Sequence, residues 1–144
     1  SNEGPLHFEL VTGNLSQIRT LYDLLLKREH HISHKNSQNF SGHRYFVANH
    51  PYRKWYLISR DHSYIGSVYV GYDNCIGVNM LEKYILENLQ LVLRWIVANH
   101  HPLPPIPSKR AHHFSINVPI TNRSMIASLE LAECDATQMT FRLN

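Results

Sequence analysis

The segment from Trp55 to Ile96 constrains the fold more than any other part of the chain. Aromatic and β-branched residues are dense around 55–58, over 64–70 and over 75–80, and short polar stretches separate these three runs. Residues 82–99 then carry apolar side chains around most of a helical circumference, which is the pattern of a buried helix. The segment therefore predicts an antiparallel three-stranded meander followed by a helix packed into the core.

The flanking segments add helices and strands on both sides of this centre. Strand-like alternation and helical spacing of apolar residues predict, in chain order, a strand at 7–11, helices at 15–26 and 41–49, then, after the central segment, a strand at 112–118, a helix at 122–134 and a last strand at 136–143.

The resulting order is β-α-α-β-β-β-α-β-α-β, which predicts an α/β (α+β) fold with a mixed sheet. A crossover through the buried helix makes the strands at 75–80 and 112–118 parallel neighbours. The loop between the helix and the later strand holds four of the seven prolines and is expected to be irregular.

Length and composition indicate one soluble domain. The chain has 144 residues, and we expect a single domain over 3–144, with Ser1 and Asn2 as a scar of tag removal. No apolar run approaches the roughly 18 residues of a membrane span, so we expect no membrane partner. Cys75 and Cys134 form neither a metal spacing nor a disulfide framework, and a cytoplasmic location is expected.

The charge of the chain does not favour nucleic acid. The formal net charge is +3, but the basic residues are scattered, whereas a phosphate-binding face needs them clustered. Nucleic acid is therefore an unlikely partner. Aromatic residues around 52–72 that remain exposed would line an acceptor cleft or the surface of a homodimer.

Several short stretches, together with the order of elements, resemble the GCN5-related N-acetyltransferase (GNAT) superfamily over almost the whole chain. The stretches are 64–69 (YIGSVY), 76–78 (IGV), 115–118 (SINV) and 122–124 (NRS). The resemblance implies a splay between the fourth and fifth strands that binds acetyl-CoA or another acyl-CoA as co-substrate. An acyl group would then pass to an amine by direct attack.

The resemblance also implies positions for the cofactor contacts. Val78 and Met80 would give backbone contacts to pantetheine, as an added strand would receive them. Glu87, Asn88 and Leu89 would form the turn that holds the pyrophosphate, because helix N-termini favour anions. Asn122 would contact the CoA arm or, as an alternative, cap the helix that follows it.

The sequence departs from the family at the phosphate turn. Alignment with the family puts Leu86 and Asn88 at the two glycine positions, and Ile85 at the basic position. Glycines let the backbone approach phosphates, so their replacement indicates a degenerate CoA loop. Glu87 would also repel a pyrophosphate. The alternative, which we favour, is that Leu86 and Leu89 simply continue the core helix.

A second departure concerns the acid that protonates the leaving thiolate. Many family members carry a tyrosine seven positions after the late-helix asparagine, and that position is Leu129. Ser128 beside it is the candidate substitute, although a hydroxyl is a poor acid near neutral pH.

Histidines offer a base and, as an alternative, a metal site. His43 lies in the predicted second helix, where related acetyltransferases carry polar residues near the acceptor site, and a neutral His43 would take a proton from an amine. His30, His31 and His34 form a cluster, but adjacent histidines rarely point to one metal and no spacing completes a site, so we expect no metal.

The sequence therefore predicts a divergent acyl-CoA-dependent N-acyltransferase acting on a small-molecule or peptide amine. A catalytically inactive GNAT-fold protein that binds a small molecule or a protein partner is the main alternative. A nucleic-acid-binding module is a remote third. No nucleophile elbow, P-loop or dinucleotide fingerprint is present, which argues against the commonest hydrolases, NTPases and dehydrogenases.

Overall fold

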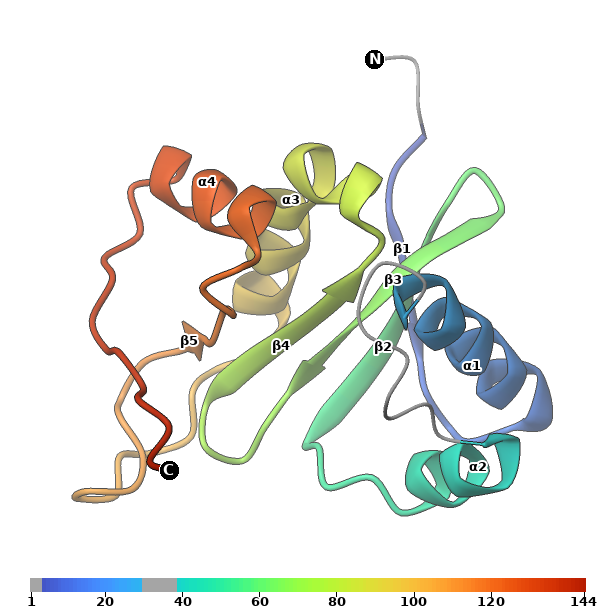
Figure 1. Cartoon of the computed structure of the whole chain (residues 1–144), viewed down its shortest axis with the longest axis horizontal. Coiled ribbons are helices and arrows are strands. Elements are labelled where there is room, and N and C mark those ends of the chain that lie inside the picture. The colour runs from blue at the N-terminus through green and yellow to red at the C-terminus, as the bar shows by residue number, and fades with distance from the viewer. Residues whose placement is uncertain (1–3, 30–38) are drawn as a thin grey trace.

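The fold is the predicted mixed α/β arrangement, and its one sheet has five strands, without the last strand that the sequence predicted (Figure 1). The computed structural model describes residues 4–29 and 39–144. The sheet has the order β1-β2-β3-β4-β5, with β4 and β5 parallel and the other neighbours antiparallel. The strands are β1 (His7–Leu10), β2 (Lys54–Arg60), β3 (Ser63–Val70), β4 (Cys75–Met80) and β5 (Ser115–Ile116). The helices are α1 (Leu15–Glu29), α2 (Phe40–Ala48), α3 (Glu82–Asn99) and α4 (Arg123–Leu131).

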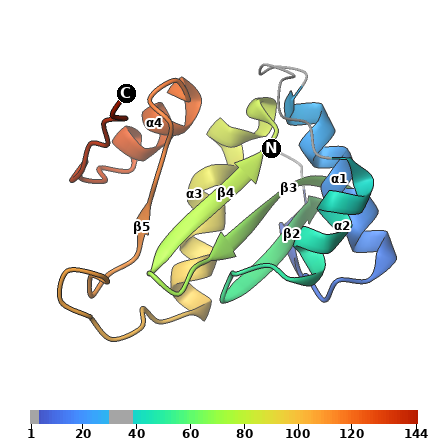
Figure 2. The same ribbon diagram turned by 60° about the horizontal axis from the view of Figure 1, so that its bottom comes forward.

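Helices cover both faces of the sheet because its strands carry apolar side chains on both sides (Figures 1 and 2). Tyr56 and Val68 point into the cluster formed with α3, whereas Trp55 and Leu57 point into the cluster formed with α1 and α2. Successive residues of β2 thus serve opposite faces, which follows from the two-residue period of a strand. The sheet is the middle of three layers.

The long apolar helix of the sequence is α3, and it packs as predicted. Leu89, Val92 and Ile96 are fully buried in the cluster against the sheet. α4 lies against α3 and adds Met125 to the same cluster (Figure 1). Within the described residues, no helix combines the length and apolar character that a bilayer crossing requires.

The pairing of β4 with β5 starts at one end and then stops. Cys75 pairs with Ser115 and Ile76 with Ile116, and no further β5 pairing continues along β4 within the described part of the chain. The parallel pairing predicted for these segments is confirmed. Figure 2 shows the two strands close together near the start of β4 and apart toward its end, so the sheet has the expected splay.

Asn74 fastens the proline-rich loop to the start of β4. Its side-chain amide donates to the carbonyls of Leu103 and Ala111, both at 2.9 Å, and its Oδ1 accepts from the Leu103 N–H at 2.8 Å. Its own carbonyl accepts from the N–H of Ser115 at 3.1 Å. The residue is fully buried and has a positive φ of 65°. The hydrogen bonds of this one residue therefore fix the position at which β5 begins after the loop.

The C-terminal segment differs from the prediction. The last strand expected at 136–143 is not formed, and these residues have no regular structure. The alternating side chains Met139, Phe141 and Leu143 are 73%, 76% and 91% exposed. A last strand would have to pair with β5. Because β5 has only two residues, it offers almost no backbone hydrogen-bonding groups to such a strand.

We expect Asn74→Gly to lower the free energy of unfolding by about 2–4 kcal/mol, because three hydrogen bonds made by a fully buried side chain are lost. Glycine accepts the positive φ, so the loss measures the side chain rather than backbone strain. Chemical denaturation gives the value, with exposed Asn117→Gly as the baseline for a glycine substitution. A loss equal to that baseline would show that the loop is held by other contacts.

Candidate acyl-CoA slot and acceptor pocket

The backbone of β4 presents unpaired groups to the splay. The Gly71 N–H bonds to the Cys75 carbonyl at 2.8 Å, and the Leu81 N–H bonds to the Ile65 carbonyl at 3.3 Å. The backbone N–H and C=O groups of the odd-numbered residues of β4 therefore point toward β3. Antiparallel ladders alternate, and the N–H and C=O groups of Val78 and Met80 therefore point away from β3. These are the two residues that the family resemblance assigns to pantetheine, and that role stays a prediction.

The N-terminus of α3 lies directly after β4. The helix begins at Glu82, and its N-cap Leu81 makes no side-chain capping bond. The Tyr84 N–H bonds to the Leu81 carbonyl at 2.9 Å. The N–H groups of Glu82 and Lys83 have no partners within the helix, so they point out of the end of α3 beside the end of β4. Glu82 in that turn is the local negative charge, and it opposes an anionic ligand.

The residues assigned to the pyrophosphate turn are already helical. Glu87, Asn88 and Leu89 lie within α3, and Leu89 is fully buried in the core. Asn88 is also buried, where its Oδ1 accepts from Arg60 Nη1 at 2.6 Å and its amide donates to the Tyr84 carbonyl at 2.9 Å. The core helix therefore continues through residues 87–89, as the favoured alternative of the sequence analysis predicted. The backbone N–H groups of α3 that lack partners within the helix lie about one turn before residues 87–89, at its N-terminus.

The two candidate residues of α4 serve its packing. Asn122 caps the helix, because its Oδ1 accepts from the Met125 N–H at 3.2 Å. Ser128 is buried on the side of α4 that contacts α3, and its carbonyl accepts from Gln90 at 3.2 Å while its hydroxyl has no hydrogen-bond partner among the described residues. Their proposed roles toward CoA and the thiolate stay predictions.

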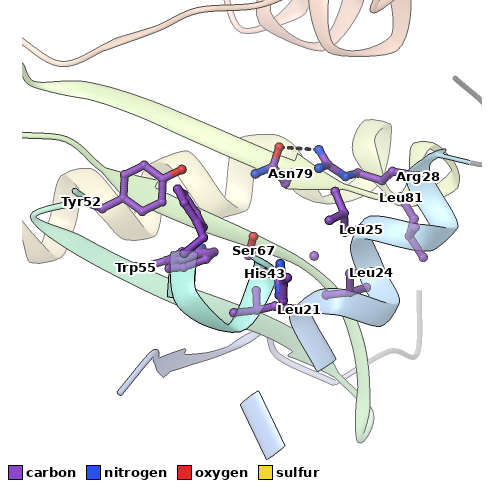
Figure 3. Close-up of a pocket in the computed structure, with 12 residues that line it drawn as sticks. Leu21, Leu24, Leu25, Arg28, His43, Tyr52, Trp55, Ser67, Asn79 and Leu81 are labelled. Carbon is purple, nitrogen blue, oxygen red and sulfur yellow. Dashed lines mark hydrogen bonds between the residues drawn. The ribbon is translucent and has the colours of Figure 1, made fainter. Parts of the chain in front are cut away.

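A pocket of about 190 Å³ lies between the sheet and the two N-terminal helices. Twelve residues line it, and they come from α1, α2, the loop before β2 and its first residues, the middle of β3, and the end of β4 with the residue that follows it (Figure 3). The apolar wall is formed by Leu21, Leu24 and Leu25 of α1. The pocket lies on the face of the sheet opposite α3.

His43 of α2 lines this pocket with a ring nitrogen that lacks a partner. The ring is buried, and burial lowers the pKa of His43 below 6.5, although a hydrogen bond to the Ile18 backbone acts in the opposite direction. The Nε2 atom is buried and has no hydrogen-bond partner among the described residues. A neutral imidazole has one nitrogen without a proton, so neutral His43 can act as a base.

Arg28 and Asn79 join α1 to β4 at one side of the pocket (Figure 3). Arg28 Nη1 donates to Asn79 Oδ1 at 2.6 Å. Ser67 of β3 and His43 lie between this pair and the aromatic side of the pocket, where Figure 3 shows Tyr52 and Trp55. The lining therefore changes from cationic to aromatic across the pocket.

The aromatic side is a stack supported by the sheet. The Tyr52 ring lies parallel to Tyr69 with centroids 3.8 Å apart, and the Tyr69 ring covers Gly77, where it leaves no room for a Cβ. Trp55 meets Tyr52 and Phe46 edge to face at 5.2 and 6.0 Å. These contacts fix the rings, so the wall is rigid.

The sequence indicated part of this pocket. Tyr52 and Trp55 were expected to line an acceptor cleft if exposed, and His43 was expected near it. Arg28, Ser67 and Asn79 were missed, and the one available signal was the polar pair Ser67 and Asn79 within otherwise apolar strands.

Only some of the histidines considered for a metal site lie within the described residues. His30, His31 and His34 lie outside the described residues. Across 4–29 and 39–144, no group of three or more His, Cys, Asp or Glu side chains is placed to hold a metal ion. His100 instead packs in the fold, where its Nε2 is 2.8 Å from the Tyr56 hydroxyl.

Comparison with known proteins identifies the fold. No protein-family model and no curated protein sequence matches the chain. Among solved structures, a possible acetyltransferase from Clostridium difficile 630 matches with a TM-score of 0.57 and 9% identity, covering 98% of this chain and 99% of the other. AAC(6')-Iy, in complex with the bisubstrate analogue CoA-S-monomethyl-acetylneamine, matches with a TM-score of 0.60 and 8% identity, covering 98% of both chains. At these identities the likeness concerns the fold alone, and the chain has a GNAT-like acetyltransferase fold.

Proposed function

We propose that the protein is a divergent acyl-CoA-dependent N-acyltransferase. The observation that carries this proposal is the end of β4, where an unpaired backbone edge at Val78 and Met80 adjoins a pocket lined by His43. An extended pantetheine arm can pair with such an edge as an added strand would. AAC(6')-Iy, which shares the fold, is bound to a CoA-containing analogue in its solved structure.

The end of α3 would receive the phosphates of the co-substrate. The unpaired amides of its first turn and the positive end of the helix dipole favour an anion. Without the glycines of the usual loop, the contacts would come from the turn at Glu82 and Lys83 rather than from residues 87–89. Lys83 offsets part of the charge of Glu82.

The chemistry follows from the position of His43. The nitrogen of a neutral amine forms a bond to the thioester carbonyl carbon, the carbon–sulfur bond breaks, and CoA leaves as a thiolate. The His43 imidazole, which lines the pocket, accepts the proton that the amine loses, directly or through a water molecule. The thiolate takes a proton from water or from Ser128, the acid proposed from the sequence. No covalent enzyme intermediate is needed.

A catalytically inactive ligand-binding protein is the second candidate. Two observations favour it over catalysis: α3 is helical through 87–89, and Leu129 occupies the position of the usual tyrosine acid. In that case the pocket between the sheet, α1 and α2 would hold a small molecule without acyl transfer.

We expect acetyl-CoA to stabilise the protein, by ~2.7 kcal/mol at 100 times its dissociation constant. Val78→Pro should weaken acetyl-CoA binding about 5–10-fold, because it removes an N–H that faces the splay while the bonds between β4 and β3 remain. Thermal unfolding at increasing acetyl-CoA concentrations measures both effects.

Val78→Ala is the matched control, since it removes similar side-chain bulk but keeps the N–H. Equal binding by the two variants would place CoA away from this edge. No stabilisation by millimolar acetyl-CoA or by longer acyl-CoAs would contradict the acyltransferase proposal and favour the inactive binder.

We expect kcat/KM for acyl transfer to fall as the pH drops through the pKa of His43, which lies below 6.5. The reason is that only the neutral imidazole accepts a proton, so activity is present above this pKa and lost below it. His43→Gln should lower kcat about 100-fold and remove this acidic limb from the pH profile.

His100→Gln is the control for that measurement. Burial also lowers the pKa of His100, but His100 packs against Tyr56 and Trp95 on the other face of the sheet. This variant should keep the acidic limb. An unchanged pH profile in His43→Gln would exclude His43 as the base.

A further inference from the structure

Segment 136–143 has the sequence pattern of a strand but no partner. Every residue from 130 to 144 is exposed, and Met139, Phe141 and Leu143 keep most of their surface in solvent. Within the described part of the chain, no hydrogen bond joins the backbone of 135–143 to another residue. The segment therefore leaves its backbone donors and acceptors, together with a row of apolar side chains, open to a neighbour.

The composition of segment 136–143 does not protect it from pairing. It contains no glycine, no proline and no carboxylate, and Arg142 is its only charged residue. Exposed segments of this kind pair readily with another chain, and natural proteins usually prevent this with lysines, prolines or bulges. The absence of such features in the sequence favours a segment that pairs in the native protein.

The described residues place no strand edge beside this segment. β5 has only two residues, and β1, the other outer strand, lies at the opposite end of the sheet. Figures 1 and 2 both show the chain after α4 on the outer side of that helix, away from α1 and α2. A neighbouring strand would therefore have to come from a second molecule.

The end of α4 fixes the point at which the segment leaves the fold. Glu133 has a positive φ of 58°, and the Cys134 N–H bonds to the Leu129 carbonyl at 3.0 Å, which closes the last turn of the helix. α4 is itself held in place by Met125, which is buried in the core cluster with α3. The segment thus begins from a defined position on the surface.

We infer that segment 136–143 is a dimerisation strand, which pairs in an antiparallel manner with the same segment of a second copy of this chain. Antiparallel pairing of one sequence with itself is closed by a twofold axis, because residue i opposes residue j and residue j opposes residue i. A second copy therefore supplies the missing neighbour without requiring an edge elsewhere on the fold.

The alternation within the segment suits such pairing. A register with the twofold axis at Thr140 pairs the whole segment and keeps its apolar side chains on one face, where Met139 lies opposite Phe141 of the second copy. On the other face, Arg142 lies opposite Gln138 of the second copy, so the two arginines do not oppose each other.

The apolar face of the paired strands also needs cover, because a two-stranded ribbon alone is marginal in water. Leu131, the last residue of α4, is 77% exposed and is the nearest large apolar side chain before the segment. We expect it to belong to the same interface.

The first test is sedimentation velocity of the full chain over a wide range of protein concentration. We expect a reversible dimer. Thr140→Pro removes a backbone N–H, and Phe141→Lys places a charge on the apolar face, so each should weaken the dimer at least about tenfold. Tyr45→Lys is the matched control, because Tyr45 is 72% exposed on α2, outside the segment. This variant should associate like the wild type.

The second test is a charge series at Gln138, which reports the pairing of the segment with itself. Gln138→Glu would face Arg142 of the second copy and should tighten the dimer about fivefold, whereas Gln138→Lys should weaken it about fivefold. Adding Arg142→Glu to Gln138→Lys should restore the affinity, because opposite charges face each other again.

The possible results separate this arrangement from its alternatives. A chain that stays monomeric at hundreds of micromolar would overturn the inference and leave the segment to a partner of another kind. A dimer that survives both Thr140→Pro and Phe141→Lys would overturn it by placing the interface elsewhere. Equal effects of Gln138→Glu and Gln138→Lys would exclude pairing between the two segments.

The folding of each variant is measured by thermal unfolding at a concentration where the wild type is monomeric. Because the segment makes no hydrogen bonds within the described residues, Thr140→Pro and Phe141→Lys should keep the melting temperature of the monomer. A lower melting temperature in both variants would show that the segment packs on its own chain, which would also overturn the inference.

Discussion

Three hydrogen bonds of one fully buried side chain, Asn74, determine how the sheet ends. They hold Leu103 and Ala111 of the proline-rich loop, and the Asn74 carbonyl receives the N–H of Ser115. β5 is therefore tied to β4 at one end only. Beyond Ile76 nothing in the described structure continues the ladder, so the strands separate and the edge of β4 becomes available to a ligand.

The sheet then divides the proposed chemistry between its edge and one face. The edge at Val78 and Met80 suits an extended arm, while the face toward α1 and α2 holds the pocket with His43 and Arg28. The opposite face is packed against α3. Because Asn79 alternates with Val78 and Met80 along β4, the same strand directs backbone groups into the splay and a side chain toward the pocket.

The sequence predicted those parts of the fold that depend on local patterns. The strands at 64–70 and 75–80 and the helix at 82–99 have clear periods, and the crossover through that helix implied that β4 and β5 are parallel. The prediction of a strand at 136–143 was wrong although apolar and polar residues alternate there. A strand also needs a neighbouring strand to pair with, and β5 is too short to provide one.

The candidate site was less predictable because its residues meet only through the tertiary fold. Arg28 comes from the end of α1 and Asn79 from the end of β4, and nothing in either segment marks the other as its partner. The same holds for Asn74, whose position indicated a turn but not bonds to residues about 30 positions away. His43 was placed near the acceptor by family resemblance, and its unpartnered Nε2 emerged only from the burial of α2.

The central claim is that the unpaired edge of β4 is an acyl-CoA slot, and amide hydrogen exchange tests it most directly. Val78 and Met80 amides face the splay, whereas Gly77 and Asn79 amides face β3. With saturating acetyl-CoA, the account predicts that exchange slows at Val78 and Met80 and stays unchanged at Gly77 and Asn79. Unchanged exchange at Val78 and Met80 in the presence of saturating acetyl-CoA would contradict it.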